Sequence, residues 1–148
     1  QNKINKIIHL FCIPMIVWSF CVILHNFNNY SEISYYDQVL LKVNISFASL
    51  ISFFYLLFYT FIDYKVFIPM FFYLGTIFVS SYYFNQYVIN SIAYAIYVNL
   101  FSWIMQFIGH FIFEGNRPAL LDSIAQSFLM APLFSYYEFK DICKSKNN

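Results

Sequence analysis

IIHLFCIPMIVWSFCVIL, residues Ile7 to Leu24, is the first apolar run of this chain, and it points directly to the class of fold. A helix needs about 20 mostly apolar residues to cross the hydrocarbon core of a bilayer. Four more apolar runs follow at approximately Val39 to Ile62, Val66 to Phe84, Val88 to Phe113 and Pro118 to Tyr137. These runs are continuous and are too long for barrel strands of about ten alternating residues. We therefore predict an all-α fold, a polytopic membrane bundle of about five transmembrane helices.

The composition excludes the main alternatives to a membrane protein. Hydrophobic residues make up 61% of the 148 residues and charged residues only 10%, whereas soluble domains average about 25% charged. Disordered chains are polar and poor in aromatic residues, unlike this one. The net charge of +1 gives no reason to expect a nucleic acid partner. We expect one integral membrane domain over residues 1–148, with a polar tail at 138–148 and a short segment preceding Gln1.

The positive residues do not orient the predicted helices across the membrane. Five spans would place Lys3, Lys6, Lys65 and Arg117 on one face, and Lys42, Lys140, Lys144 and Lys146 on the other. Because both faces carry the same positive charge, the positive-inside rule is uninformative. The path of the chain back and forth across the membrane, here called its threading, does have a further consequence. It brings the start of the first span, the end of the fourth and the start of the fifth to one face of the membrane. Polar residues that are distant in sequence would converge there.

The end of the fourth run carries the main candidate site. His110 and Glu114 are four residues apart and share one helix face, with Gln106 one turn further in. Ionisable residues within a span are costly and are usually functional or paired. A histidine and a carboxylate one turn apart can bind Fe(II), Mn or Zn. Alternatively they only form a hydrogen bond between helices, and the spacing alone favours this simpler interpretation.

His9 is the second candidate, because the threading brings it to the same face as His110. Asn5 precedes His9 by four residues and shares its helix face. The simpler interpretation is a histidine that contacts lipid headgroups. His25 lies about 24 Å further along the helix, so we expect it at the opposite interface.

Three more polar residues follow Gly115, which allows the helix to end. Arg117 could bind a substrate carboxylate, or it could form a salt bridge with Glu114 or contact a lipid phosphate. Asp122 and Gln126 share a face of the fifth helix and could orient metal ligands. Both could instead form hydrogen bonds between helices.

Two blocks of sequence carry a resemblance to a known family. The first is Asn2-Lys3-Ile4-Asn5 through His9, followed by Pro14. The second contains Gln106-Phe107-Ile108-Gly109-His110, Phe113-Glu114-Gly115, Arg117-Pro118-Ala119-Leu120-Leu121-Asp122, Gln126 and Ala131-Pro132. Together they resemble the fungal 2-hydroxy-fatty-acid dioxygenases of phytosphingosine breakdown and their relatives. Residues 30–98 match that family only in hydropathy.

The resemblance implies a multi-pass protein of the endoplasmic reticulum membrane. It also implies an enzyme that uses Fe(II) and O₂ to shorten a long-chain 2-hydroxy fatty acid by one carbon. Histidines hold the iron in that family, and His9 and His110 are the matching positions here. A further family histidine would lie just before Gln1. From this resemblance, together with the polar residues described above, we expect Glu114 and Arg117 as catalytic residues, with Glu114 also a possible third ligand or a residue that orients His110. Asn5, Gln106, Asp122 and Gln126 would support the site.

Two other classes of function remain compatible with the sequence. A small transporter or a structural membrane protein would use the same polar residues only to hold helices together. A zinc-dependent lipid hydrolase would work without O₂ and would release no shortened acid. The sequence predicts neither the chain-length preference nor the oligomeric state.

Overall fold

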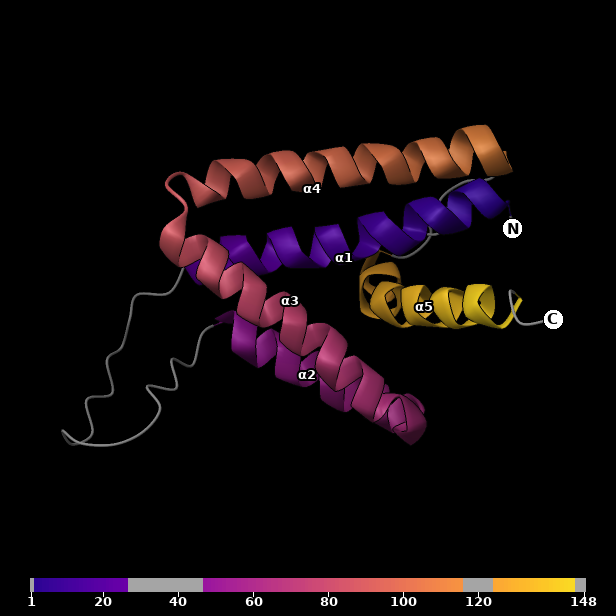
Figure 1. Ribbon diagram of the computed structural model, residues 1–148, viewed down its shortest axis with the longest axis horizontal. Helices are drawn as coiled ribbons and strands as arrows, with labels where there is room; N and C mark the ends of the chain where they lie inside the picture. The colour runs from indigo at the N-terminus through magenta and orange to yellow at the C-terminus, as the bar shows by residue number, and fades with distance from the viewer. Residues whose placement is uncertain (1, 27–46, 116–123, 146–148) are drawn as a thin grey trace. The chain divides into compact units, whose positions relative to one another are not determined.

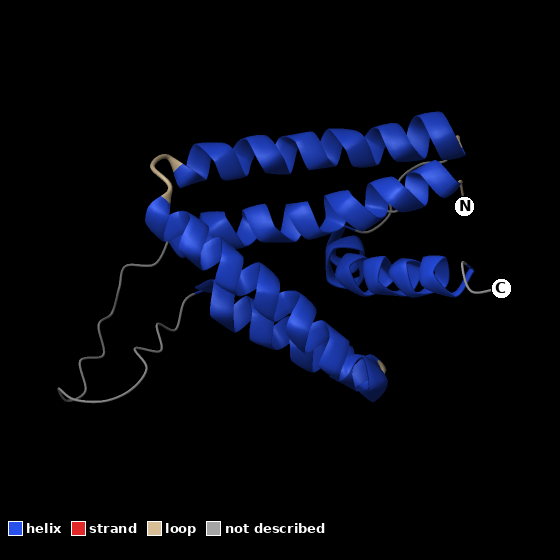
Figure 2. Ribbon diagram, viewed as in Figure 1, coloured by secondary structure: helices blue, strands red, loops and turns tan. Residues whose placement is uncertain are grey.

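The computed structural model describes residues 2–26, 47–115 and 124–145, and these residues are almost entirely helical (Figure 2). The helices are α1 (Lys3–Asn26), α2 (Phe47–Ile62), α3 (Phe67–Tyr87), α4 (Ser91–Ile108) and α5 (Ile124–Ser145), with a short 3₁₀ turn η1 (Tyr64–Val66) and a π-helical segment η2 (Gly109–Glu114). No strand occurs in the described ranges. The prediction of an all-α fold is confirmed.

Among the residues that the structure describes, three stretches of helix are long and apolar enough to cross a membrane. They are α1, the stretch Tyr64–Tyr87 that joins η1 to α3, and the stretch Ser91–Phe113 that joins α4 to η2. The second predicted span corresponds to α2, whose 16 described residues fall short of that length. Residues 39–46 and 118–123 of the predicted spans lie outside the described part of the chain.

The chain divides into two compact units, Gln1–Phe20 with Ala93–Asn148, and Cys21–Ile92. In the first unit, α1 and α4 run antiparallel and side by side (Figure 1). Asn2 caps α1, because its Oδ1 accepts a hydrogen bond from the backbone N–H of Ile4 at 2.9 Å. Polar side chains then join the two helices. Asn2 Nδ2 donates to the Phe113 carbonyl at 3.1 Å, and Asn99 Nδ2 donates to Ser19 Oγ at 2.9 Å.

The second unit is built on the antiparallel pair α2 and α3. Asp63 begins the turn between them, where its Oδ1 accepts a hydrogen bond from the backbone N–H of Lys65 at 3.0 Å. Tyr59 of α2 and Met70 of α3 are completely buried. His25, which we expect at the opposite membrane interface, is only 5% exposed within the protein. It packs against Phe78 and Tyr82, with ring centroids 5.2 and 5.6 Å away.

The C-terminal helix differs most from the sequence prediction. α5 continues to Ser145, so the polar residues from Glu138 onward begin inside a helix and not after one. Five full spans would also have placed Glu138 and Lys140 on the face opposite His9. Instead, Glu138 lies beside His9. Within the described residues, α5 is not among the stretches that are long and apolar enough to cross a membrane, and residues 118–123 of the predicted fifth span lie outside the described part of the chain.

Candidate functional site

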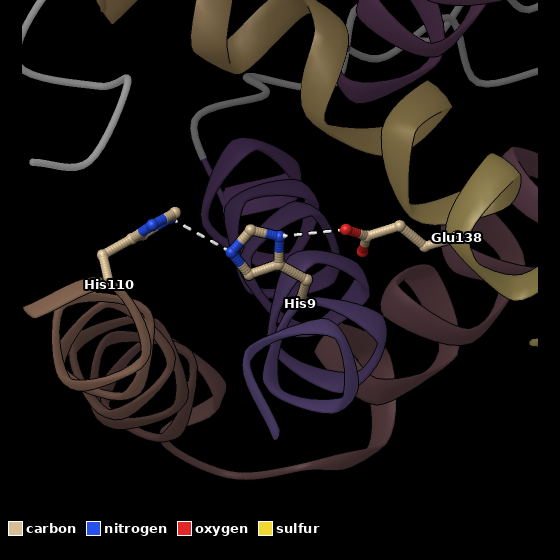
Figure 3. A network of polar contacts seen from close by, with 3 residues as sticks. All are labelled: His9, His110 and Glu138. Atoms are coloured by element: carbon tan, nitrogen blue, oxygen red, sulfur yellow. Dashed lines mark hydrogen bonds and ion pairs between the residues drawn. The ribbon is translucent and has the colours of Figure 1, made fainter. Parts of the chain in front are cut away.

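The candidate site is built around two histidines that lie 101 residues apart in sequence. His9 comes from α1 and His110 from η2, and their Nε2 atoms are 3.1 Å apart (Figure 3). The ring centroids are 4.9 Å apart, and the ring planes are inclined by 57°. The structure therefore brings together the two imidazoles that the threading placed on one face.

A change of helix type at the end of α4 determines where the His110 side chain lies. The α-helical hydrogen bonding of α4 ends at Ile108 and continues as π-helix over Gly109–Glu114. The segment ends as the sequence predicts, because Gly115 has a φ of 63° and its backbone N–H bonds to the His110 carbonyl. Single π-helical turns inside α-helices occur frequently at functional sites, since they change the direction in which one side chain points.

Gly109 and Asn5 allow α1 and η2 to approach closely. A Cβ atom at position 109 would overlap Asn5 Oδ1, whose side chain is almost fully buried at 1% exposure. Asn5 is one turn from His9, and Gly109 precedes His110. The missing side chain of Gly109 therefore makes room for the short distance between the two imidazoles.

Glu138 of α5 is the site residue that the sequence analysis did not find. Its Oε1 lies 3.7 Å from His9 Nδ1, within ion-pair distance, on the opposite side of the imidazole from His110 (Figure 3). The Glu138 side chain is only 11% exposed. The sequence did not single it out, because Glu138 stands among other charged residues of the polar C-terminal segment.

The structure describes only some of the other predicted site residues. Asn5 and Gln106 are both buried, and the atoms Asn5 Oδ1 and Gln106 Nε2 have no hydrogen-bond partner in the described part of the chain. Glu114 lies in η2 and Gln126 in α5, but their side chains are outside the described set. Arg117 and Asp122 lie outside the described residues altogether.

The histidine pair fits two ligands of one transition-metal ion. Two nitrogens bound at right angles, each about 2.1 Å from a metal, lie about 3.0 Å apart, close to the 3.1 Å between the two Nε2 atoms. Imidazole is a good ligand for iron. No group of three His, Cys, Asp or Glu side chains with metal-binding geometry occurs within the described ranges. A complete coordination sphere would need further ligands from other parts of the chain, from substrate or from water.

The fold and the histidine pair define a helical protein with membrane-length helices and a candidate metal site between α1 and η2. Comparison with known proteins shows to which family this chain belongs. Residues 1–141 match the family described as "2-hydroxy-palmitic acid dioxygenase Mpo1-like". This match covers nearly the whole chain, and the chain belongs to that family.

A curated relative is similar over a shorter stretch. It is the 2-hydroxy-palmitic acid dioxygenase MPO1 of Saccharomyces cerevisiae, 53% identical over 38 residues. The matched stretch covers 26% of this chain and 22% of the yeast protein. No solved structure matches this chain.

Proposed function

We propose that this chain is an Fe(II)-dependent dioxygenase that removes one carbon from long-chain 2-hydroxy fatty acids, with His9 and His110 as iron ligands. The observation that carries the proposal is the pair of facing Nε2 atoms, 3.1 Å apart, in a part-buried polar cluster between α1 and η2. Membership of the Mpo1-like family supports the reaction class. The name of the yeast relative supports the substrate class, since it refers to 2-hydroxy-palmitic acid.

The reaction balances with O₂ as the sole oxidant. The C1–C2 bond of the 2-hydroxy acid breaks, C1 leaves as carbon dioxide, and C2 becomes the carboxyl carbon of the shortened acid. The shortened acid, carbon dioxide and water together account for all atoms of the substrate and of O₂. His9 and His110 would hold the iron, and the ion would supply activation of both the 2-hydroxy acid and O₂, so no 2-oxoglutarate is required.

The residues of the chain have separate roles in this proposal. His9 and His110 bind the ion through Nε2. Gln106 Nε2 is a buried donor without a hydrogen-bond partner among the described residues, one turn from His110, and suits a substrate oxygen. Leaving such a donor unpaired is costly, so a polar ligand here would be favoured. The apolar surfaces of the helices accept the acyl chain, and each buried CH₂ contributes about 0.8 kcal/mol. We also place the protein in the endoplasmic reticulum membrane, in keeping with a lipid substrate.

The test is aerobic incubation of the purified full chain with 2-hydroxy-palmitate, followed by mass spectrometry of the fatty acids. We expect the acid one carbon shorter when Fe(II) and O₂ are both present, and none when either is removed. Formation of the product without O₂ would indicate hydrolysis. Unchanged substrate, with no iron retained by the protein, would indicate a transporter or a structural protein and would contradict the proposal.

A further inference from the structure

We infer that Glu138 is a positioning residue, which holds the His9 imidazole so that Nε2 is presented to the metal. This inference rests on the proposed function, because it assigns a role at the same site. It concerns a carboxylate in α5, outside both sequence blocks that carry the family resemblance.

The first argument is the order of the three side chains. Glu138, His9 and His110 form a line in which the two outer groups contact different nitrogens of the His9 ring (Figure 3). A neutral imidazole carries one N–H, and a carboxylate can only accept a hydrogen bond. Glu138 therefore favours the tautomer with hydrogen on Nδ1. That tautomer leaves the lone pair of Nε2 directed toward His110, as metal binding requires.

The second argument is burial. Glu138 is 9% exposed, and its Oε2 is buried without a hydrogen-bond partner in the part of the chain that the structure describes. A carboxylate in such surroundings is costly unless it is paired. A cation bound at Nε2 would polarise the Nδ1–H group toward the carboxylate and offset part of that cost.

The third argument is distance. At 3.7 Å the Oε1 to Nδ1 contact is longer than a hydrogen bond. Contacts in a catalytic site are often long before ligands bind and become shorter in the complete complex. A shift of less than an ångström would form a carboxylate–histidine–metal arrangement, in which the carboxylate fixes the orientation of the ligand and makes it more basic.

A merely structural role for Glu138 makes a different prediction from a positioning role. If the carboxylate only held α5 to α1, its loss would lower stability and leave the metal affinity of the folded protein unchanged. If it positions His9, its loss weakens metal binding directly. Asp141 provides the matched control, because it is a carboxylate on the same helix, one turn further on, and is exposed.

The experiment titrates metal-free full-length protein with Co(II), as a spectroscopic probe, and anaerobically with Fe(II). We expect Glu138→Ala to weaken metal affinity about 10- to 100-fold and to change the Co(II) absorption spectrum. Glu138→Gln keeps the shape of the side chain and an acceptor oxygen but lacks the charge, so it should lose less metal affinity than Glu138→Ala. Asp141→Ala should bind as the wild type does. Folding of each variant is checked by helical circular dichroism, and if Glu138→Ala is misfolded, Glu138→Gln decides.

The outcomes separate this inference from the proposed function. Wild-type protein that binds neither metal would contradict the iron site itself. Wild-type protein that binds metal, with Glu138→Ala and Glu138→Gln equal to it in affinity and spectrum, would overturn the role of Glu138 alone and leave the histidine site standing.

Discussion

At the scale of single residues, the site depends on polar groups placed where an apolar helix makes them expensive. His9 and His110 were predictable from sequence for this reason, since each interrupts a run that is otherwise suited to lipid. Glu138 was not predictable in the same way, because it stands among other charged residues that look like a solvated tail. Its burial and its pairing with His9, both of which require the fold, distinguish it from the exposed Asp141.

Replacing Gly109 by alanine should disturb the site through shape alone. The new Cβ would overlap Asn5 Oδ1 in a buried contact, and overpacking of this kind typically costs about 1–3 kcal/mol. We expect lower stability in detergent unfolding experiments and weaker iron binding, because the two imidazoles must move apart.

Gly75→Ala is the control for that substitution. A Cβ at position 75 of α3 would meet no atom within 4 Å, so this variant should be neutral or gain up to about 1 kcal/mol from helix propensity. Combining Gly109→Ala with Asn5→Ala should restore part of the lost stability. Equal effects of alanine at positions 75 and 109 would refute the close approach.

At the scale of helices, the sequence predicted which segments are helical better than it predicted where each helix begins and ends. The first and third apolar runs became α1 and α3 with small changes of boundary, because long apolar runs leave little choice of structure. Gly115 ended η2 as predicted. The π-helical form of η2 was not predictable, because it depends on the packing of α1 against it. The predicted fifth run ends at Tyr137, whereas α5 continues through polar residues to Ser145.

The hydrogen bond from Asn99 to Ser19 should join α1 to α4 measurably. Polar bonds between membrane helices average about 0.6 kcal/mol, with a maximum of about 1.7 kcal/mol. We expect Asn99→Ala to lower stability within this range. A double-mutant cycle with Ser19→Ala measures the coupling, and additive effects of the two substitutions would show that the 2.9 Å contact contributes nothing.

At the scale of the whole molecule, the described residues of the proposed site belong to one compact unit, although they come from distant parts of the chain. His9, His110 and Glu138 all lie within Gln1–Phe20 and Ala93–Asn148. An ion shared by the two histidines would cross-link α1 and η2. Hydropathy indicates that these helices exist, but only the threading of the chain and the packing of α5 bring the three side chains together.

Metal removal should therefore lower the stability of the folded protein. A ligand that binds only the native state stabilises it by about 2.7 kcal/mol at a free concentration about 100 times Kd. We expect Fe(II) to raise the unfolding temperature of the wild type and a chelator to reverse the effect. Addition of Fe(II) should leave the unfolding temperature of the His110→Ala protein unchanged. An equal rise in the unfolding temperature of both proteins would contradict an ion bound by the histidines.

The most direct test of the central claim, that His9 and His110 share one iron ion, is the iron content of purified protein after loading with Fe(II) and removal of the excess. His9→Ala and His110→Ala are compared with wild type, and His25→Ala, which removes an imidazole from the other unit, is the control. We predict one iron per chain in the wild type and in His25→Ala, and loss of bound iron in the other two, with membrane insertion unchanged. A His110→Ala protein that keeps its iron and still shortens 2-hydroxy-palmitate would contradict the account.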